Sequence, residues 1–469
     1  MTLTRQSATQ LLTDLQSGTL SAADLMQATL AQIDQVNGGV NAIVALRDGD
    51  DLMAEARAMD DGPNRGPLHG LPIAVKDLVN VAGVVSSHGS PTLAGFVPDR
   101  DDLIAARMRA AGAILIGKTN TPEFGLGSHT FNPVYGATRN PYDAGRTCGG
   151  SSGGAAVALA TGMVALADGS DMMGSLRNPA AWNNVYGFRP SWGRVPSEPM
   201  GDTFLHQLAT LGPMARSPED LALLLDVISG PDPRQPHGYA CDAVAPVTAA
   251  DPKGMRIGWL GDWGGAFAME PGILEQSETA LTVMQGLGAQ VDHVEPPFSA
   301  DAMWDSWITL RSWAVAAGLA PLLAQNAPLK DTAIWETERG LALSAMDVHR
   351  ASVIRSDWFK CAAKLFETYD ALVLPSVQVW PFDVDIPYPT EIAGQGMDTY
   401  HRWMQVVIPV SLIGLPCLAA PAGFGTQGAA AGLPVGVQIF GPCGSDAALL
   451  ALGAAYHAAT NWPQTRPAM

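Results

Sequence analysis

Hydrophobic positions along the chain follow two different spacings, and each spacing predicts a different kind of element. Apolar residues recur at helical spacing over residues 7–17, and Gly18 ends this predicted helix. Ser21 and Asp24 have the spacing of a capping box for a second helix, which we expect to end at Gly38. The same spacing predicts a third helix at Asp102–Ala111. Apolar runs that are too short for a helix predict strands at Val40–Leu46, Leu71–Val79 and Ala113–Ile116.

The second half of the chain continues to alternate between helices and strands. Ser217 caps a predicted helix over Leu221–Ile228, and a Pro- and Gly-rich connection over Gly230–Lys253 follows it. A helix is expected near Pro271–Leu287, and residues 301–369 are mainly helical. The remaining predictions are strands at Arg256–Leu260, Gln290–Val294, Leu372–Leu374, Val406–Ile413, Cys417–Ala420 and Val435–Phe440, and a closing helix over Ala447–Ala459. This alternation indicates an α/β fold.

Tryptophans are concentrated in the helical region of residues 301–369. Trp304 and Trp307 fall on one face of the predicted helix, an arrangement that is typical of core packing. The alternative is that these side chains form the wall of an apolar substrate pocket. The sequence leaves both interpretations open.

Composition favours a large globular protein and excludes one class of partner. Of the 469 residues, 47% are hydrophobic and only 15% are charged, a balance that supports a large buried core. The formal net charge of -18 argues against a nucleic-acid partner, because phosphate binding needs clusters of Lys and Arg.

The N-terminal residues and the cysteines favour a cytoplasmic protein, and the longest apolar run does not favour a membrane span. The N-terminal MTLTRQSATQ has no apolar signal core, and the five cysteines are widely spaced without a CxxC pair, as expected of free thiols in a reducing compartment. The longest apolar run, Val406–Phe424, is interrupted by Pro409, Gly414, Pro416 and Pro421. These breaks favour buried strands and turns over a membrane helix.

One motif in the chain matches the phosphate-binding pattern GxxxxGK[ST], at Gly112–Thr119. In that motif the middle residues form a loop that cradles phosphate, whereas Ala-Ile-Leu-Ile in this chain is typical of a buried strand. We therefore reject nucleotide binding, and we expect neither a cofactor nor a metal ion.

The stretch Gly149–Arg177 carries the densest candidate chemistry. It begins GGSSGG and ends GSDMMGSLR, so Ser151, Ser152 and Ser175 lie among glycines that let the backbone approach a ligand closely. Hydroxyls beside such backbone favour a nucleophile with amide donors directed at it. A Ser/Gly linker is disfavoured because the neighbouring residues are apolar and patterned.

Lys76 interrupts the apolar run Leu71–Val79. It is either a surface lysine at the end of a strand, paired with Asp77, or a lysine that burial keeps neutral and available as a base. The local residues alone leave both interpretations open.

Two other kinds of nucleophile fit the chain less well. Gly149–Gly153 matches the nucleophile elbow GxSxG, but that motif needs a buried strand before the serine, and Pro141–Cys148 is a polar loop. None of the nine histidines lies in a catalytic context. A nitrilase-like mechanism would use a cysteine with a glutamate and a lysine, and Cys148 has no such arrangement around it.

Taken with the motifs around them, Lys76, Ser151 and Ser175 resemble the amidase signature family over nearly the whole chain. The resemblance is densest in GPLHGLPIAVKD (Gly66–Asp77), GKTNTPEFG (Gly117–Gly125), GGSSGG (Gly149–Gly154), SDMMGSLRNPA (Ser170–Ala180) and GLPVGVQIFGP (Gly432–Pro442). It implies an α/β fold with a central, mixed, twisted β-sheet surrounded by α-helices. It also implies one domain over residues 1–469, comprising an N-terminal helical segment (1–65), a triad-bearing core (66–230) and a variable, Trp-rich helical region with closing strands (231–469).

The resemblance implies a Ser–cisSer–Lys triad. Ser175 would be the nucleophile, Ser151 the bridging serine with a cis peptide bond, and Lys76 the base. The backbone N–H groups of four residues would form an oxyanion hole: Met172, Met173, Gly174 and Ser175. Four further residues match supporting positions of the family: Ser152, Ser170, Asp171 and Arg177.

The chain departs from the family pattern at two positions. The family usually has Gly-Gly-Ser at the nucleophile, where this chain has Met173-Gly174-Ser175. Backbone donors survive this exchange, but a methionine side chain now lies at the edge of the site. Cys148 stands where a proline is common, with no consequence expected for catalysis.

The implied activity is hydrolysis of a C–N bond next to a carbonyl. The tryptophans, Met172 and Met173 favour a small-to-medium apolar or aryl amide as the substrate, with carbamates and esters as further candidates. A homodimer is compatible with the sequence. The alternative is the catalytic amidase subunit of a tRNA-dependent amidotransferase, which would release ammonia only within its complex. An inactive scaffold is disfavoured, because all three triad positions are filled.

Overall fold

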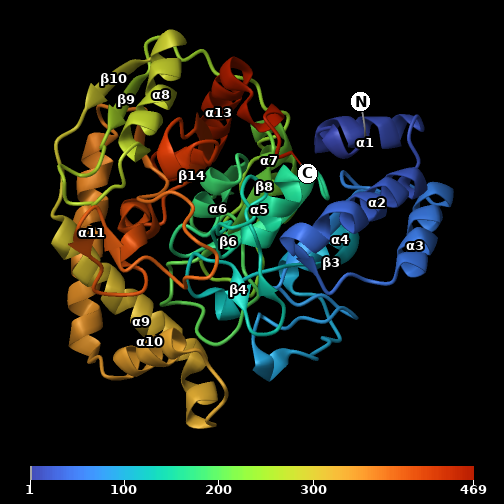
Figure 1. The fold of residues 1–469 in the computed structure, drawn as a ribbon, viewed down its shortest axis with the longest axis horizontal. Helices are drawn as coiled ribbons and strands as arrows, with labels where there is room; N and C mark the ends of the chain where they lie inside the picture. Colours follow the sequence, from blue (N-terminus) through green and yellow to red (C-terminus); the bar gives the residue numbers. More distant parts are fainter. Residues whose placement is uncertain (1–2, 469) are drawn as a thin grey trace.

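A computed structural model describes residues 3–468, and two β-sheets form its centre (Figure 1). The larger sheet has eight strands in the order β10–β9–β11–β15–β14–β7–β8–β6. Its pairs β10–β9 and β9–β11 are parallel and its other pairs are antiparallel, so the sheet is mixed. In chain order the strands are β6 (Leu166–Asp171), β7 (Tyr186–Arg189), β8 (Thr210–Ala215), β9 (Arg256–Trp259), β10 (Gln290–His293), β11 (Ala371–Pro375), β14 (Cys417–Phe424) and β15 (Pro434–Phe440).

The smaller sheet has three strands in the order β1–β3–β2, with β2 parallel and β1 antiparallel to β3. The bounds are Ile43–Val44 for β1, Pro72–Lys76 for β2 and Ile114–Thr119 for β3. Strand β2 packs against β6, at the edge of the large sheet. The two sheets therefore meet where the sequence places its candidate lysine. Short two-stranded pairs form elsewhere, between β4 (Phe131–Asn132) and β5 (Gly136–Ala137) and between β12 (Glu391–Ile392) and β13 (Gln395–Gly396).

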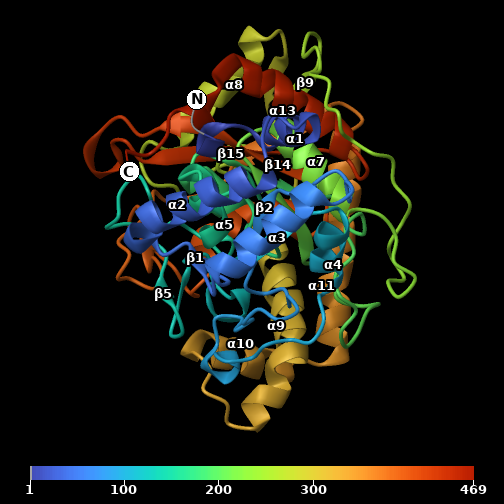
Figure 2. The ribbon, with the colours of Figure 1, turned by 90° about the vertical axis from the view of Figure 1, so that its right-hand side faces the viewer.

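Helices surround both sheets, as Figures 1 and 2 show. Helices α1 to α4 lie on one side of the molecule in Figure 1 and α9 to α11 on the opposite side. The helices are α1 (Ala8–Ser17), α2 (Ala22–Val40), α3 (Gly49–Asp61), α4 (Leu103–Ala110), α5 (Gly153–Ala160), α6 (Arg177–Trp182), α7 (Pro218–Ile228), α8 (Ile273–Gly286), α9 (Ala300–Ala324), α10 (Asp331–Leu341), α11 (Ala345–Leu365), α12 (Ile408–Ser411) and α13 (Asp446–Thr460). Among the described helices, α9 is long and apolar enough to cross a membrane by length and composition, and 44% of its apolar window is buried within the protein.

The capping signals of the sequence are confirmed at the N-terminal helices, with one difference in length. The Ser21 hydroxyl accepts a hydrogen bond from the Asp24 N–H and begins α2 as expected. The helix continues past Gly38 to Val40, because Asn41 rather than the glycine takes the left-handed conformation that ends it (φ 53°).

The strand predicted at Val406–Ile413 is wrong. Residues 402–407 form a 3-10 turn and Ile408–Ser411 forms the short helix α12, with Pro409 in its first turn. Proline is favoured at that position because its missing N–H has no helical partner there. The run is buried on every side, so its continuous apolar character could not distinguish a strand from helical turns.

Three of the four tryptophans of α9 and α11 lie in the core, and the fourth, Trp313, is partly buried against it. Trp304, Trp307 and Trp358 are buried, and Trp358 donates a hydrogen bond to the Pro409 carbonyl. The core interpretation of the tryptophan pattern is therefore confirmed. The five cysteines are all free thiols.

Candidate active site

Lys76 is the last residue of β2, and its side chain is fully buried between the two sheets. Its backbone N–H donates to Asp168 Oδ1 of β6 at 2.9 Å, which ties the two sheets together at this point. Asp77 does not pair with Lys76. It lies 3.7 Å from the ammonium of Lys118 instead, and it accepts a hydrogen bond from the Ser87 hydroxyl. The surface interpretation of Lys76 is therefore wrong.

The Lys76 amine is surrounded by serine hydroxyls. Its Nζ lies 2.7 Å from Ser151 Oγ, 2.8 Å from Ser152 Oγ and 3.0 Å from Ser170 Oγ. Three of the serines singled out in the sequence thus converge on one buried nitrogen. Burial lowers the pKa of Lys76 to about 7, and the carboxylates of Asp168 and Asp171 only partly oppose this shift.

Ser151 and Ser152 are held in place by the close approach of helix α5 to its neighbours. The Gly150–Ser151 peptide bond is cis, as the resemblance implied. A Cβ on Gly154 would lie 2.3 Å from the Asn120 backbone nitrogen, so only glycine allows this approach. The Gly150 carbonyl accepts a hydrogen bond from the Ser128 hydroxyl at 2.6 Å, which fixes the turn before the helix.

Ser175 lies in the loop between β6 and α6, and it lines the same cavity as Ser151 and Ser170. Its hydroxyl makes no hydrogen bond to any residue that the structure describes, and 7% of the residue is exposed. The Ser152 N–H donates to the Ser175 carbonyl at 3.3 Å, which joins the two serine-bearing segments directly.

Three of the four expected oxyanion donors remain available. The Gly174 N–H donates to Asp171 Oδ1 at 2.9 Å, so the expectation that it faces the substrate does not hold in this structure. The N–H groups of Met172, Met173 and Ser175 donate to no acceptor among the described residues. Gly174 adopts a left-handed conformation (φ 82°) that directs its N–H to Asp171, and a Cβ there would meet Asn178 Oδ1 at 2.7 Å.

Asp171 organises the loop that carries Ser175. It receives the side chain of Arg177 at 2.9 Å and that of Arg189 at 3.1 Å, and also the Leu176 N–H. Burial alone would raise the pKa of Asp171, but the two guanidinium groups outweigh burial and hold that pKa well below its usual range. Arg177 also donates to Gln438 Oε1 and to the Val407 carbonyl, so the loop is fastened to β15 and to the segment before α12.

Replacing Asp171 with asparagine is expected to destabilise the protein strongly. The substitution leaves two buried guanidinium groups without their carboxylate, and breaking such buried pairs costs about 3–5 kcal/mol. Chemical denaturation would measure the free energy of unfolding. Asp357→Asn is the matched control, because Asp357 pairs with Lys360 on the surface and its loss should change stability little. Equal stability of the two variants would contradict the bracing role.

The cavity beside Ser175 has a volume of about 160 Å³ and a mainly apolar wall. Six of its lining residues are large apolar side chains: Leu78, Phe124, Leu126, Met172, Met173 and Met404. None of the tryptophans lines it, so the pocket-wall interpretation of Trp304 and Trp307 is wrong. The apolar wall comes instead from four segments: after β2, around Phe124, after β6 and before α12.

Arg311 of α9 is the charged residue in the cavity wall, and the sequence pattern did not reveal it. Its guanidinium pairs with Glu336 of α10 at 2.7 Å and donates to the Tyr400 hydroxyl at 2.8 Å. Its remaining terminal nitrogen faces Met172 Sδ at 3.4 Å. The one sequence signal that could have indicated Arg311 as a site residue is its position as an isolated arginine in a helix rich in buried apolar residues.

The two alternative nucleophiles do not fit this site. No histidine is among the residues that line the cavity, which removes the partner that a nucleophile elbow needs. Cys148 is fully buried away from the cavity, and burial raises the pKa of its thiol to about 12. The phosphate-loop match is also excluded, because Ile114–Thr119 forms the buried strand β3.

Comparison with known proteins defines the class of the molecule. The sequence profile of the family named Amidase matches residues 24–450. An acylamidase of Rhodococcus erythropolis is 33% identical over 98% of this chain and 97% of its own length. A glutamyl-tRNA(Gln) amidotransferase subunit of Chloroflexus aurantiacus is 34% identical over 97% of this chain and 96% of its own length.

Among solved structures, a bacterial aryl acylamidase of the amidase signature family superposes with a TM-score of 0.90. It is 28% identical, over 98% of this chain and 99% of that one. The protein is therefore a hydrolase with an α/β fold. The chain belongs to the amidase signature family, and both the resemblance drawn from its motifs and the expected fold class are confirmed.

Proposed function

We propose that the protein is a serine-dependent amidohydrolase that cleaves small-to-medium apolar or aryl amides through an acyl-enzyme. The observation that carries the proposal is the environment of Lys76, a fully buried amine within 3.0 Å of three serine hydroxyls. Since burial lowers its pKa to about 7, a large fraction of this amine is neutral near neutral pH and can accept a proton.

A neutral Lys76 amine can form a hydrogen bond with each of the three serines, two as donor and one as acceptor. A neutral amine has two N–H donors and one lone pair, whereas an ammonium has three donors and no acceptor. Donation to Ser152 and Ser170 leaves the lone pair facing Ser151, the nearest of the three at 2.7 Å. In this assignment Ser152 and Ser170 orient the base, and Ser151 relays the proton.

The chemistry then proceeds in two half-reactions. Ser151 gives its proton to Lys76 and takes the proton of Ser175, while Ser175 Oγ forms a bond to the substrate's carbonyl carbon. The proton returns along the relay to the amine nitrogen as the C–N bond breaks, which leaves an ester on Ser175. Water then attacks this ester, releases the carboxylic acid and restores the serine. The relay requires a hydrogen bond between Ser151 and Ser175, and such catalytic contacts commonly tighten when substrate binds.

The oxyanion that forms at the carbonyl needs donors, and the loop before Ser175 offers them. The N–H groups of Met172, Met173 and Ser175 are free of other acceptors among the described residues. One donor of this kind typically contributes about 2.7–4 kcal/mol to lowering the barrier.

The cavity supports an apolar or aryl group on the substrate. Its volume of about 160 Å³ is close to that of engineered cavities of about 150 Å³ that bind benzene. Glutamine, the substrate class of the rival amidotransferase, carries an ammonium group, and no Asp or Glu is among the lining residues to bind one. Arg311 is already neutralised by Glu336, which favours a neutral substrate over a carboxylate.

A role within an amidotransferase remains the rival function, because relatives of that name are as similar as the acylamidase. The test is a panel of anilides, primary amides, carbamates and esters given to the purified chain alone, with amine or alcohol release as the readout. We expect turnover of anilides without any partner. Release of ammonia from glutamine only after partner proteins are added would establish the rival.

Met172 is expected to limit the size of the accepted acyl group. It is partly buried in the cavity wall, three residues before the nucleophile. In Met172→Ala, the ratio of kcat/KM for a naphthoyl anilide to that for a benzoyl anilide should rise about tenfold or more, since pocket volume discriminates on this scale. Met200→Ala is the control, because Met200 is 71% exposed and does not line the cavity. An unchanged ratio in Met172→Ala would refute this assignment.

A further inference from the structure

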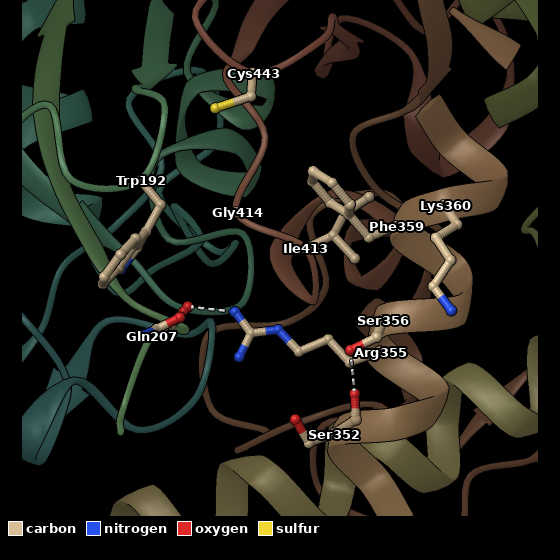
Figure 3. A pocket seen from close by; sticks show the side chains of 10 residues that line it. All are labelled: Trp192, Gln207, Ser352, Arg355, Ser356, Phe359, Lys360, Ile413, Gly414 and Cys443. Carbon is tan, nitrogen blue, oxygen red and sulfur yellow. Dashed lines mark hydrogen bonds between the residues drawn. The ribbon is translucent and has the colours of Figure 1, made fainter. Parts of the chain in front are cut away.

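A second cavity, of about 430 Å³, lies outside the catalytic site (Figure 3). It opens between helix α11, which provides Arg355 and Phe359, and the loops after β7 and α12, which provide Trp192 and Ile413. This volume falls within the range of about 300–1,000 Å³ that is usual for small-molecule sites. None of its lining residues lines the catalytic cavity.

Arg355 is the unusual group in this second cavity. Figure 3 shows its side chain extending from α11 across the cavity toward Gln207. One nitrogen donates to the Gln207 carbonyl at 2.9 Å, and no carboxylate among residues 3–468 forms an ion pair with the guanidinium. Burial lowers the pKa of Arg355, and no neighbouring charge acts on it. Because a guanidinium carries five N–H donors, most of them have no protein acceptor among the described residues.

The other cation at this cavity has a partner. Lys360 stands at the rim, largely exposed, and its ammonium binds Asp357 at 2.8 Å. The single uncompensated charge therefore belongs to Arg355. Arg355 is only partly buried, and its guanidinium has no carboxylate partner among the described residues, so an anion that enters this cavity of ligand size can pair with it.

The walls of the cavity define the rest of the ligand. Trp192 and Phe359 provide aromatic surface, and Ile413 provides aliphatic surface. A guanidinium matches the two oxygens of a carboxylate, and one guanidinium balances one negative charge. A multiply charged phosphate would need more donors and would gain nothing from the apolar walls.

We propose that this cavity is a second binding site, which takes a small carboxylate with an aryl or alkyl body through Arg355, Trp192 and Phe359. The site lies next to the catalytic one along the chain, since Gln207 lines the second cavity and Ala209 lines the first. Amide hydrolysis releases acids of this class, so under the proposed function the enzyme's own product is a member of it. Binding itself does not depend on that function.

Titration calorimetry with benzoate tests the proposal directly. Wild type and the control Lys360→Gln should bind benzoate with equal affinity, whereas Arg355→Gln should bind it at least about tenfold more weakly. Benzyl alcohol, which keeps the aryl body without the charge, and inorganic phosphate, which keeps a charge without the body, should both bind weakly to wild type.

A second variant and a kinetic measurement distinguish benzoate binding in this cavity from misfolding of a variant and from binding in the catalytic cavity. Phe359→Ala changes a residue that is 42% exposed and should therefore fold, and it should weaken benzoate binding as well. The basal rate of anilide hydrolysis should be the same in all of these variants. Equal benzoate affinity in wild type and Arg355→Gln would overturn the proposal. So would purely competitive inhibition by benzoate that Arg355→Gln leaves unchanged, because benzoate would then occupy the catalytic cavity.

Discussion

Replacing Ser175 with alanine is expected to lower kcat by at least about 10⁴-fold while the fold is retained, since removing a nucleophile eliminates the acyl-enzyme route. The hydroxyl faces the catalytic cavity and makes no hydrogen bond to the described residues, so its removal leaves no buried polar group without a partner. Steady-state kinetics on an anilide would measure the loss, and thermal unfolding would check the fold.

Two further variants test whether the loss of activity is specific to Ser175. Ser17→Ala removes an exposed serine at the end of α1 and should leave activity unchanged. Ser152→Ala removes a hydroxyl that contacts Lys76 without carrying the relay, so it should retain more activity than Ser151→Ala. If Ser175→Ala retained turnover near the wild-type level, the nucleophile would have to be another residue.

Replacing Lys76 with methionine is expected to cost about 10²–10⁴-fold in kcat/KM, because it removes the base but fills the same buried space. The pH profile gives the sharper readout. Burial lowers the pKa of Lys76 to about 7, so the amine is protonated and inactive below that pH and neutral and active above it. The kcat/KM of wild type should therefore rise as the pH increases through about 7.

The residual activity of Lys76→Met should lack this rise with pH. A wild-type rate that is highest below pH 6 and falls above neutrality would contradict the assignment of Lys76 as the base, whatever the activity of the variant. Lys118 is a second fully buried lysine, but it pairs with Asp77 and does not line the cavity. Burial also lowers the pKa of Lys330, to about 8, and its ammonium donates to the carbonyl of Leu126 in the cavity wall, so the loss of the rise in Lys76→Met is what assigns it to Lys76.

The sequence could predict the reactive residues but not the role of each neighbour. Lys76 looked unusual because it interrupts an apolar strand, yet two interpretations stayed open. The contact that decides between them, β2 against β6, joins segments about ninety residues apart. Ser152 and Ser170 were expected to support the site, and their convergence on the Lys76 amine also depends on that contact.

Other features of the site could not be predicted from sequence patterns, because they depend on backbone conformation and on contacts between distant segments. Gly174 was expected to contribute an oxyanion donor, but its N–H is taken by Asp171, and only the left-handed turn shows this. The spacing of Trp304 and Trp307 on a helix is the same for core packing and for a pocket wall, so the sequence alone left both interpretations open. Arg311 reaches the cavity from α9, far along the chain from the serines.

The central claim is that Ser175 forms the acyl-enzyme, and trapping this intermediate tests it most directly. The enzyme would be mixed with an activated aryl ester, quenched in acid during the burst, and digested for peptide mass spectrometry. We predict one acyl group per chain, attached to Ser175 and absent from Ser175→Ala. Acylation of Ser151, Ser152 or Cys148 in the wild type, or a burst without any covalent adduct, would contradict the proposed mechanism.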